Sequence, residues 1–264
     1  MLKTLLYINE DLASSIALRY TAYLNKFVPL SLYVTHVVEQ TEKEQAGTGL
    51  VRRAWEDGIA SSGEQLINRM LRTENIDCPL AGRPKVVMGN RMDETNYELR
   101  SGGYKLFIEG YLNTADPDQF YEVISSPLYT NAPCPTLMVK NLSISKKCAM
   151  LCASSVDPKI LVEKSMKILG DSTFKFDIVY FKYKDNEQLQ TLGKEEGGSN
   201  LQELESLMEK AGKSVENISV LSGAPEQVGD YLKQYALVVS TLPTRKSMRM
   251  QVLANSLAAV LIVR

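Results

Sequence analysis

The sequence predicts an α/β protein made of two similar domains, each with an open, mostly parallel sheet that helices cover on both faces. Two observations predict this fold class. Apolar strand-like runs alternate with amphipathic helical stretches along the whole chain, which is the pattern of such a sheet. The pattern then begins again about 145 residues later.

The repeated unit starts with a strand, a turn of small polar residues and a helix. Residues 5–20 read LLYINEDLASSIALRY, and residues 150–165 read MLCASSVDPKILVEKS. The next strand follows at the same offset, as SLYVTHV at 31–37 and FDIVYFK at 176–182. Both segments are rich in the β-branched and aromatic residues that suit strands. The two halves are therefore expected to share their fold.

The remaining elements keep the same order in both halves. Helices are expected at about 50–72 and 199–213, where apolar residues recur at helical spacing. Three pairs of apolar strands follow: VVMGN with VLSGA, YKLFIEG with YALVVST, and PTLMVK with AVLIVR. The last pair closes each unit, so the polar stretch NLSISK forms the boundary. We place the domains at 1–141 and 146–264.

The composition is that of an ordinary globular protein. Hydrophobic residues make up 44%, charged residues 23%, and the formal net charge is -1. Divided at Lys140, the first part has 14 Lys and Arg against 17 Asp and Glu, a balance of -3, and the second has 16 against 14, a balance of +2. Neither half carries the basic surface that nucleic-acid binding requires, so we expect no nucleic acid partner.

The N-terminal run is short and is broken by Asn9, Glu10 and Asp11, so we expect neither a secretory signal nor a membrane span. The four cysteines lack C-x-x-C spacing and the chain has one histidine, which argues against a zinc site. The simplest interpretation of the four cysteines is that they are reduced thiols, as is typical of cytoplasmic proteins. We therefore expect a cytoplasmic protein without a bound metal or a membrane partner.

Four segments of the first half follow one another in a distinctive order: INEDLASSIAL, VTHVVE, VVMGN and APCPTLMVK, with weaker counterparts SGAPEQVGDYL and AAVLIVR in the second half. In this order the chain resembles the universal stress proteins in their tandem, two-domain form. The resemblance implies an adenine nucleotide α-hydrolase-like fold with five strands in each domain. It also implies an intramolecular pseudo-dimer, in which residues of about 135–140 pair antiparallel to about 259–264.

Many universal stress proteins bind ATP through a loop of pattern G-x-x-G-x9-G-[S/T] between the fourth strand and the last helix, where backbone N–H groups surround the phosphates. In the first half Gly110 takes the first glycine position, but Asn113 takes the second, and Val123 and Ile124 take the last pair. Three carboxylates lie between them: Asp116, Asp118 and Glu122. Carboxylates repel a triphosphate unless a metal intervenes.

The corresponding segment of the second half is also shorter than that of the first half. Gly223 to Leu261 spans 38 positions, whereas Gly89 to Leu137 spans 48. In the remaining TLPTRKSMRM stretch, a helix start beside basic side chains could hold an anion; the alternative is a solvated basic loop. The candidates there are Thr241, Thr244, Lys246 and Ser247, with Arg245 and Arg249 nearby.

Asn9 and Ser154 stand where the family often has an Asp that meets adenine or ribose, and both also suit a turn or a helix cap. Gly89 and Gly223 keep the family's glycine position, which a strand-end turn also requires on steric grounds. The candidate nucleotide-binding residues are therefore Asn9, Gly89, Gly110, Ser154, Gly223, Thr241, Thr244, Lys246 and Ser247.

We predict no catalytic residue. His36 ends a strand and Cys134 lies between two prolines, so both are expected to be structural. The resulting hypothesis is a non-catalytic stress-response protein that acts through protein contacts, with no cofactor. The alternative is a nucleotide-binding switch or weak ATPase that takes ATP or AMP, in the second half because of its basic cluster. The expected partners are the chain's own second domain and an unidentified protein, with a homodimer as a further option.

Overall fold

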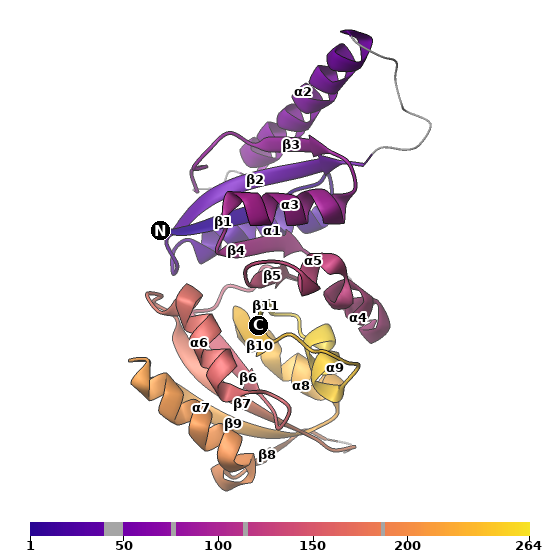
Figure 1. Ribbon diagram of the computed structural model, residues 1–264. Helices are drawn as coiled ribbons and strands as arrows, with labels where there is room; N and C mark the ends of the chain where they lie inside the picture. Colours follow the sequence, from indigo (N-terminus) through magenta and orange to yellow (C-terminus); the bar gives the residue numbers. More distant parts are fainter. Residues whose placement is uncertain (40–49, 75–77, 113–115, 186–187) are drawn as a thin grey trace.

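The computed structural model describes residues 1–39, 50–74, 78–112, 116–185 and 188–264 (Figure 1). The strands of the first half are β1 (Leu2–Tyr7), β2 (Leu30–Val38), β3 (Lys85–Met88), β4 (Leu106–Gly110) and β5 (Thr136–Val139). Those of the second half are β6 (Lys147–Cys152), β7 (Lys175–Tyr183), β8 (Gln190–Leu192), β9 (Val215–Gly223), β10 (Leu237–Thr241) and β11 (Ala259–Val263).

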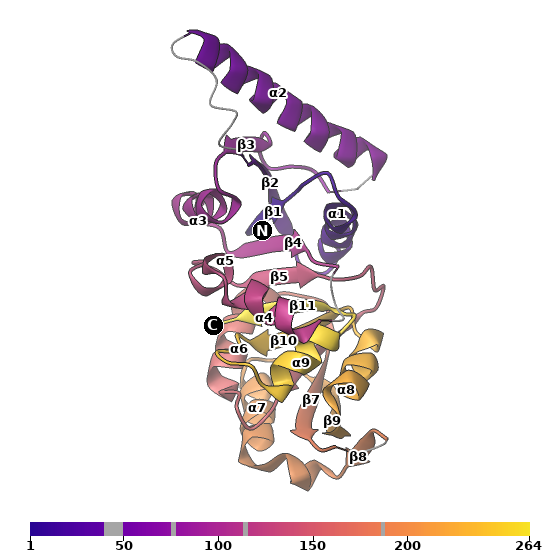
Figure 2. The ribbon, with the colours of Figure 1, turned by 90° about the vertical axis from the view of Figure 1, so that its right-hand side faces the viewer.

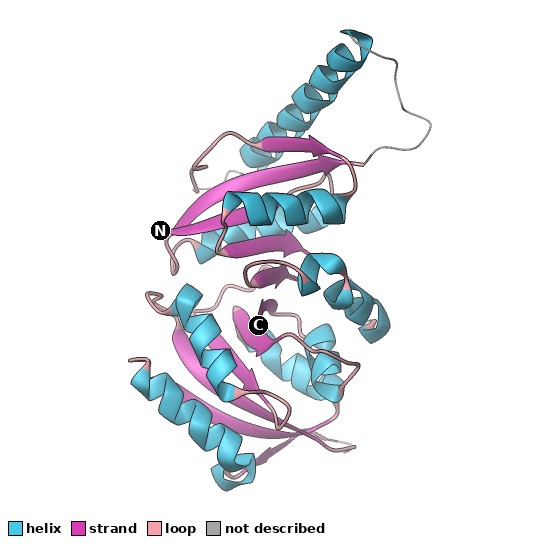
Figure 3. Cartoon of the chain, viewed as in Figure 1, coloured by secondary structure: helices cyan, strands magenta, loops and turns pink. Residues whose placement is uncertain are grey.

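Helices connect these strands and lie on both sides of them (Figure 3). The first half contains α1 (Leu12–Leu24), α2 (Leu50–Thr73), α3 (Arg91–Gly102), α4 (Pro117–Ser125) and α5 (Pro127–Thr130). The second contains α6 (Pro158–Leu169), α7 (Gly198–Lys210), α8 (Pro225–Tyr231) and α9 (Met248–Asn255), with short 3-10 turns at Lys194–Gly197 and Leu232–Gln234. None of these helices is both long and apolar enough to cross a membrane.

Within the described residues, all eleven strands belong to one continuous sheet, in the order β3-β2-β1-β4-β5-β11-β10-β6-β7-β9-β8. The prediction of an α/β fold with a mostly parallel sheet is confirmed, but the prediction of two sheets with five strands each is wrong. β5 and β11 pair antiparallel, with Leu137 opposite Leu261. The second half also has a sixth strand, β8, antiparallel to β9. Unpaired apolar strand edges at β5 and β11 would be prone to aggregation, and their pairing covers both.

Two hydrophobic clusters lie on the faces of the sheet, and each contains residues from both halves. On one face the Phe27 and Phe174 rings stack with their centres 4.5 Å apart. The buried Tyr20 hydroxyl donates a hydrogen bond of 2.8 Å to the carbonyl oxygen of Ala236. The halves therefore share their packing as well as their sheet.

Helices begin at the carboxyl ends of strands, where short polar side chains cap them. Asp11 accepts a hydrogen bond of 2.7 Å from the backbone N–H of Ser14 at the start of α1, and Ser247 accepts one of 3.2 Å from that of Met250 in α9. The other side-chain caps are Asn90, Asp116 and Asp157. These caps fix the segments that surround the candidate site.

The strand order creates one topological switch point in each half. From β1 the chain runs outward through β2 and β3, then returns to place β4 on the other side of β1. The second half does the same around β6 and β10. In open parallel sheets, ligands bind in the crevice at the carboxyl ends of the strands at such a point.

Candidate functional site

The switch point of the first half opens into a cavity of about 470 Å³. Asn9 and Asp11 line it from the segment after β1, Glu39 from the end of β2, Arg91 from the start of α3 and Gly110 from the end of β4. The cavity is therefore where the fold predicts a ligand site, and two of the nine predicted residues, Asn9 and Gly110, line it.

Arg91, the cation in this cavity, is neutralised by the protein itself. Its guanidinium forms an ion pair with Glu109, which is 3% exposed, and the Tyr129 hydroxyl donates to the same carboxylate. The guanidinium also lies 4.5 Å from the centre of the Tyr7 ring. Burial raises the pKa of Glu109, while Arg91 and Tyr129 stabilise its ionised form. Arg91 therefore offers little net positive charge to a phosphate.

Asn9 and Gly110 both have structural roles. The Asn9 N–H donates to the Ser14 hydroxyl at 2.8 Å, and its side-chain oxygen accepts from the Glu10 N–H at 2.8 Å, so Asn9 shapes the turn after β1. A Cβ added to Gly110 would lie 2.0 Å from the Ala13 carbonyl oxygen. Glycine is required there because α1 packs directly against the end of β4.

Gly89 lies at the end of β3, and two strands separate it from β4. At about 4.8 Å per strand, Gly89 is roughly 14 Å from Gly110. Its φ of +146° favours glycine whether or not a ligand binds.

The segment expected to replace the phosphate loop folds largely as a helix. Asn113 lies outside the described residues. Asp116 caps α4, Asp118 lies in its first turn, and Val123 and Ile124 belong to its last turn. The last pair of motif positions therefore belongs to α4.

In the second half an arginine occupies the switch point. Arg249, the second residue of α9, is 6% exposed and donates hydrogen bonds of 2.7 Å to the Ser240 hydroxyl and to the Thr241 carbonyl oxygen at the end of β10. Burial lowers the pKa of Arg249 to about 10. This guanidinium therefore lies buried at the carboxyl end of β10, one of the two strands that form the switch point.

The other basic and hydroxyl candidates of the second half do not converge on one point. Ser247 caps α9, and Thr244 is exposed in a bend. The Lys246 ammonium lies 2.5 Å from an Asp118 carboxylate oxygen of the first half. Among these candidates, only Thr241 contacts the buried guanidinium.

Ser154 and Gly223 also lie apart from each other. Ser154 is exposed in a turn, and its carbonyl oxygen accepts a hydrogen bond of 3.4 Å from the Asn200 amide. Gly223 ends β9, and two strands, β6 and β7, lie between β9 and β10. The sequence interpretation missed the buried role of Arg249, although an arginine just inside a predicted helix start was a visible signal.

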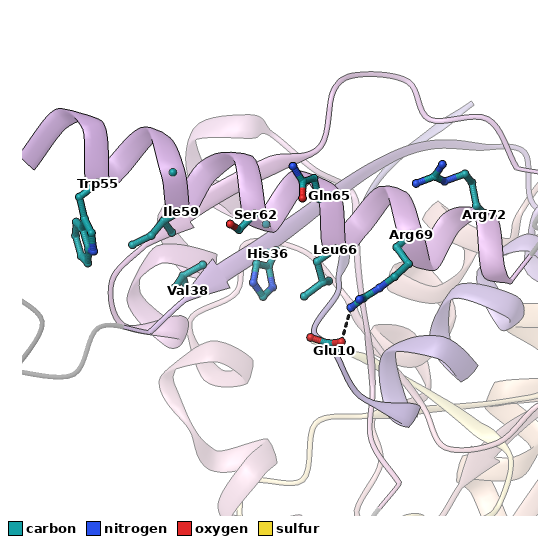
Figure 4. A pocket seen from close by; sticks show the side chains of 12 residues that line it. Glu10, His36, Val38, Trp55, Ile59, Ser62, Gln65, Leu66, Arg69 and Arg72 are labelled. Carbon is teal, nitrogen blue, oxygen red and sulfur yellow. Dashed lines mark hydrogen bonds and ion pairs between the residues drawn. The ribbon is translucent and has the colours of Figure 1, made fainter.

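A larger cavity of about 960 Å³ lies between α2 and the end of β2 (Figure 4). Trp55, Leu66 and Arg69 line it from α2, and Arg69 forms an ion pair with Glu10. His36 lies at its floor and donates from Nδ1 to the Ile8 carbonyl oxygen at 2.8 Å, a contact that ties β2 to the segment after β1. In the described part of the chain, no three His, Cys, Asp or Glu side chains gather as a metal site would require.

No protein-family model matches the sequence, and a comparison with curated proteins finds no match. Solved structures do match. A universal stress protein from Archaeoglobus fulgidus DSM 4304 superposes with a TM-score of 0.63 at 12% identity, covering 98% of this chain and 95% of that one. The chain has the universal stress protein fold.

A second solved structure superposes on nearly the whole chain. A functionally unknown protein from Pseudomonas aeruginosa PAO1 superposes with a TM-score of 0.56 at 15% identity, covering 98% of this chain and 91% of that one. A universal stress family protein from Arabidopsis thaliana with AMP bound covers 53% of this chain at a TM-score of 0.35, which is too low to transfer its ligand. The resemblance seen in the sequence is thus confirmed at the level of the universal stress protein fold.

Proposed function

We propose that this protein is a non-catalytic tandem universal stress protein that acts through contacts with other proteins, with neither half binding ATP. The observation that carries the proposal is the burial of Arg249 at the β6–β10 switch point, where it donates to Ser240 and Thr241. A nucleotide would have to displace this guanidinium and leave both acceptors without their donor. Such buried unpaired groups are costly.

Charge supports the same conclusion in the first half. Asp11 and Glu39 line the cavity, and the nearby Arg91 is paired with Glu109. Unit charges of like sign about 4 Å apart repel by roughly 4 kcal/mol near a protein surface. Among the lining residues that the structure describes, a triphosphate would meet carboxylates without an unpaired cation to offset them.

A nucleotide-binding switch or weak ATPase is the second candidate. The open cavity of about 470 Å³ at the switch point of the first half favours it. The basic cluster had pointed to the second half instead, but Lys246 pairs with Asp118 and Arg249 is buried. For this candidate the first half is therefore the better location.

Calorimetric titration of the full chain with ATP, ADP and AMP, each with and without Mg²⁺, separates the two candidates. The non-catalytic proposal predicts no saturable binding. Low-micromolar affinity for any of the three would favour the switch, and two variants would then locate the nucleotide. Arg91→Met would weaken binding in the first half, whereas Lys246→Ala would weaken it only in the second.

A further inference from the structure

A second crevice joins the two halves at the amino end of β4 and β5, opposite the switch point of the first half. Its volume is about 280 Å³. Its lining comes from the segments before β4 and β5, from α6 and from the end of β11: Tyr104, Lys105, Pro133, Cys134, Pro135, Lys164, Lys167, Ile168 and Arg264. Figure 2 shows α5, α6 and the C-terminal end of the chain on one side of the junction.

Four of these lining residues are cations and none is a carboxylate. Lys105 belongs to the first half, whereas Lys164, Lys167 and Arg264 belong to the second. A sphere of this volume is roughly 8 Å across, which is close to the Debye length of about 8 Å at physiological ionic strength. The positive charges therefore act together on whatever enters the crevice.

Most of this charge is not balanced within the protein. In the described residues, Lys105 and Lys164 have no carboxylate oxygen within 4.0 Å. Lys167 pairs with Glu163 at 3.0 Å, but both side chains are 64% exposed, so water screens that pair. Arg264 donates to the carbonyl oxygens of Tyr129 and Thr130, which carry no net charge. By contrast, Lys85, Lys147 and Lys175 all have carboxylate partners: Glu98, Asp177 and Glu216.

Apart from Tyr104, whose hydroxyl donates to Glu98 at 2.8 Å, the rest of the lining is apolar. Ile168 is 7% exposed, and Pro133 and Pro135 flank the buried Cys134. Burial raises the pKa of Cys134 to about 12, so its thiol adds no negative charge. A crevice with cations and an apolar wall suits a ligand that has a compact anionic group on an apolar body.

We propose that this crevice binds a small organic phosphate, with its phosphate at Lys105 and Lys164 and its apolar body against Pro133, Pro135 and Ile168. Lysine ammonium groups bind phosphate as point charges. The volume lies just below the roughly 300–1,000 Å³ typical of ligand sites, which favours a ligand smaller than a nucleoside triphosphate. Because the two lysines come from different halves, the bound phosphate bridges them.

Calorimetric titration of the full chain with phenyl phosphate tests the proposal. The expected result is saturable binding that added salt weakens. Loss of a charge-assisted contact costs about tenfold in affinity, so Lys164→Gln should weaken binding by about that factor, and the double variant Lys105→Gln, Lys164→Gln should weaken it further. Circular dichroism spectra confirm that each variant is folded before it is titrated.

Lys159→Gln is the matched control, because Lys159 is also on α6 but is 74% exposed, pairs with Glu203 at 3.6 Å and is not part of the lining. It should bind phenyl phosphate as the unaltered chain does. Absence of saturable binding, or equal weakening by Lys159→Gln, would overturn the proposal. Inorganic phosphate and benzyl alcohol should each bind more weakly than phenyl phosphate; equal affinity for inorganic phosphate would overturn the assignment of an organic ligand.

Discussion

The Arg249 guanidinium donates a hydrogen bond of 2.7 Å to the carbonyl oxygen of Thr241, the last residue of β10. One of its nitrogens, Nε, is buried without a partner among the described residues. A side chain from the last helix thus holds the end of a central strand, at a cost in desolvation. Two substitutions of Arg249 distinguish the contribution of its packing to stability from the contribution of its charge.

Arg249→Ala should lower the free energy of unfolding by about 3 kcal/mol, since it leaves a cavity and two acceptors without a donor. Arg249→Met should cost less, because it retains most of the volume and removes a buried charge. Urea unfolding followed by circular dichroism measures both. An alanine variant as stable as the unaltered chain would show that the guanidinium does not hold the end of β10.

The buried Lys140 makes the free energy of unfolding depend on pH. The residue is 4% exposed, and its ammonium donates to the Ala254 carbonyl oxygen at 2.9 Å and lies 4.4 Å from the centre of the Phe120 ring. Burial lowers the pKa of Lys140 from 10.5 to about 7. Between these pH values the unfolded chain binds more protons than the folded one, so the stabilising contribution present above pH 10.5 is lost as pH falls to about 7.

The chain should therefore lose up to about 5 kcal/mol of this contribution between these two pH values, whereas Lys140→Met should show no such loss. Urea unfolding of both proteins across that range gives the difference. Parallel pH profiles would mean that Lys140 is not desolvated in the folded protein.

Gly110→Ala should be strongly destabilising, because the added Cβ would lie 2.0 Å from the Ala13 carbonyl oxygen. Relief of that overlap requires α1 to shift from β4, and overpacking of this kind costs about 1–3 kcal/mol. Gly58→Ala is the control: it lies within α2 with nothing within 4 Å of the new Cβ, and it should stabilise by about 0.5–1 kcal/mol. Similar melting temperatures for the two variants would refute the close approach of α1.

Separating the chain at residue 143 should expose the paired edges of β5 and β11. Leu137 and Leu261 lie opposite each other there, and each is 1% exposed. Fragments of residues 1–143 and 144–264 should each aggregate or self-associate, because an unpaired apolar edge strand is a template for another chain. Sedimentation analysis that finds two stable monomers would contradict this role of the β5–β11 pair.

Much of the fold could be predicted from the sequence because it depends on local patterns. The helix expected at 50–72 is α2 (Leu50–Thr73), and the one expected at 199–213 is close to α7 (Gly198–Lys210). β8 was missed, since three residues that are mostly exposed carry no periodic signal.

The site was harder to predict because it depends on contacts between distant residues. Glu109 in the apolar strand YKLFIEG was a signal of a buried charge, but nothing local identified Arg91, 18 positions earlier, as its partner. Ser247 could be predicted as a cap from its own neighbourhood, whereas the burial of Arg249 depends on how α9 packs against the end of β10.

A crystal structure grown with ATP and Mg²⁺ tests most directly the claim that the protein's own side chains occupy or neutralise both switch points. The account predicts no nucleotide at either switch point, with Arg91 still paired to Glu109 and Arg249 still bonded to Thr241. A triphosphate held by main-chain amides in either half, with one of these arginines displaced, would contradict it.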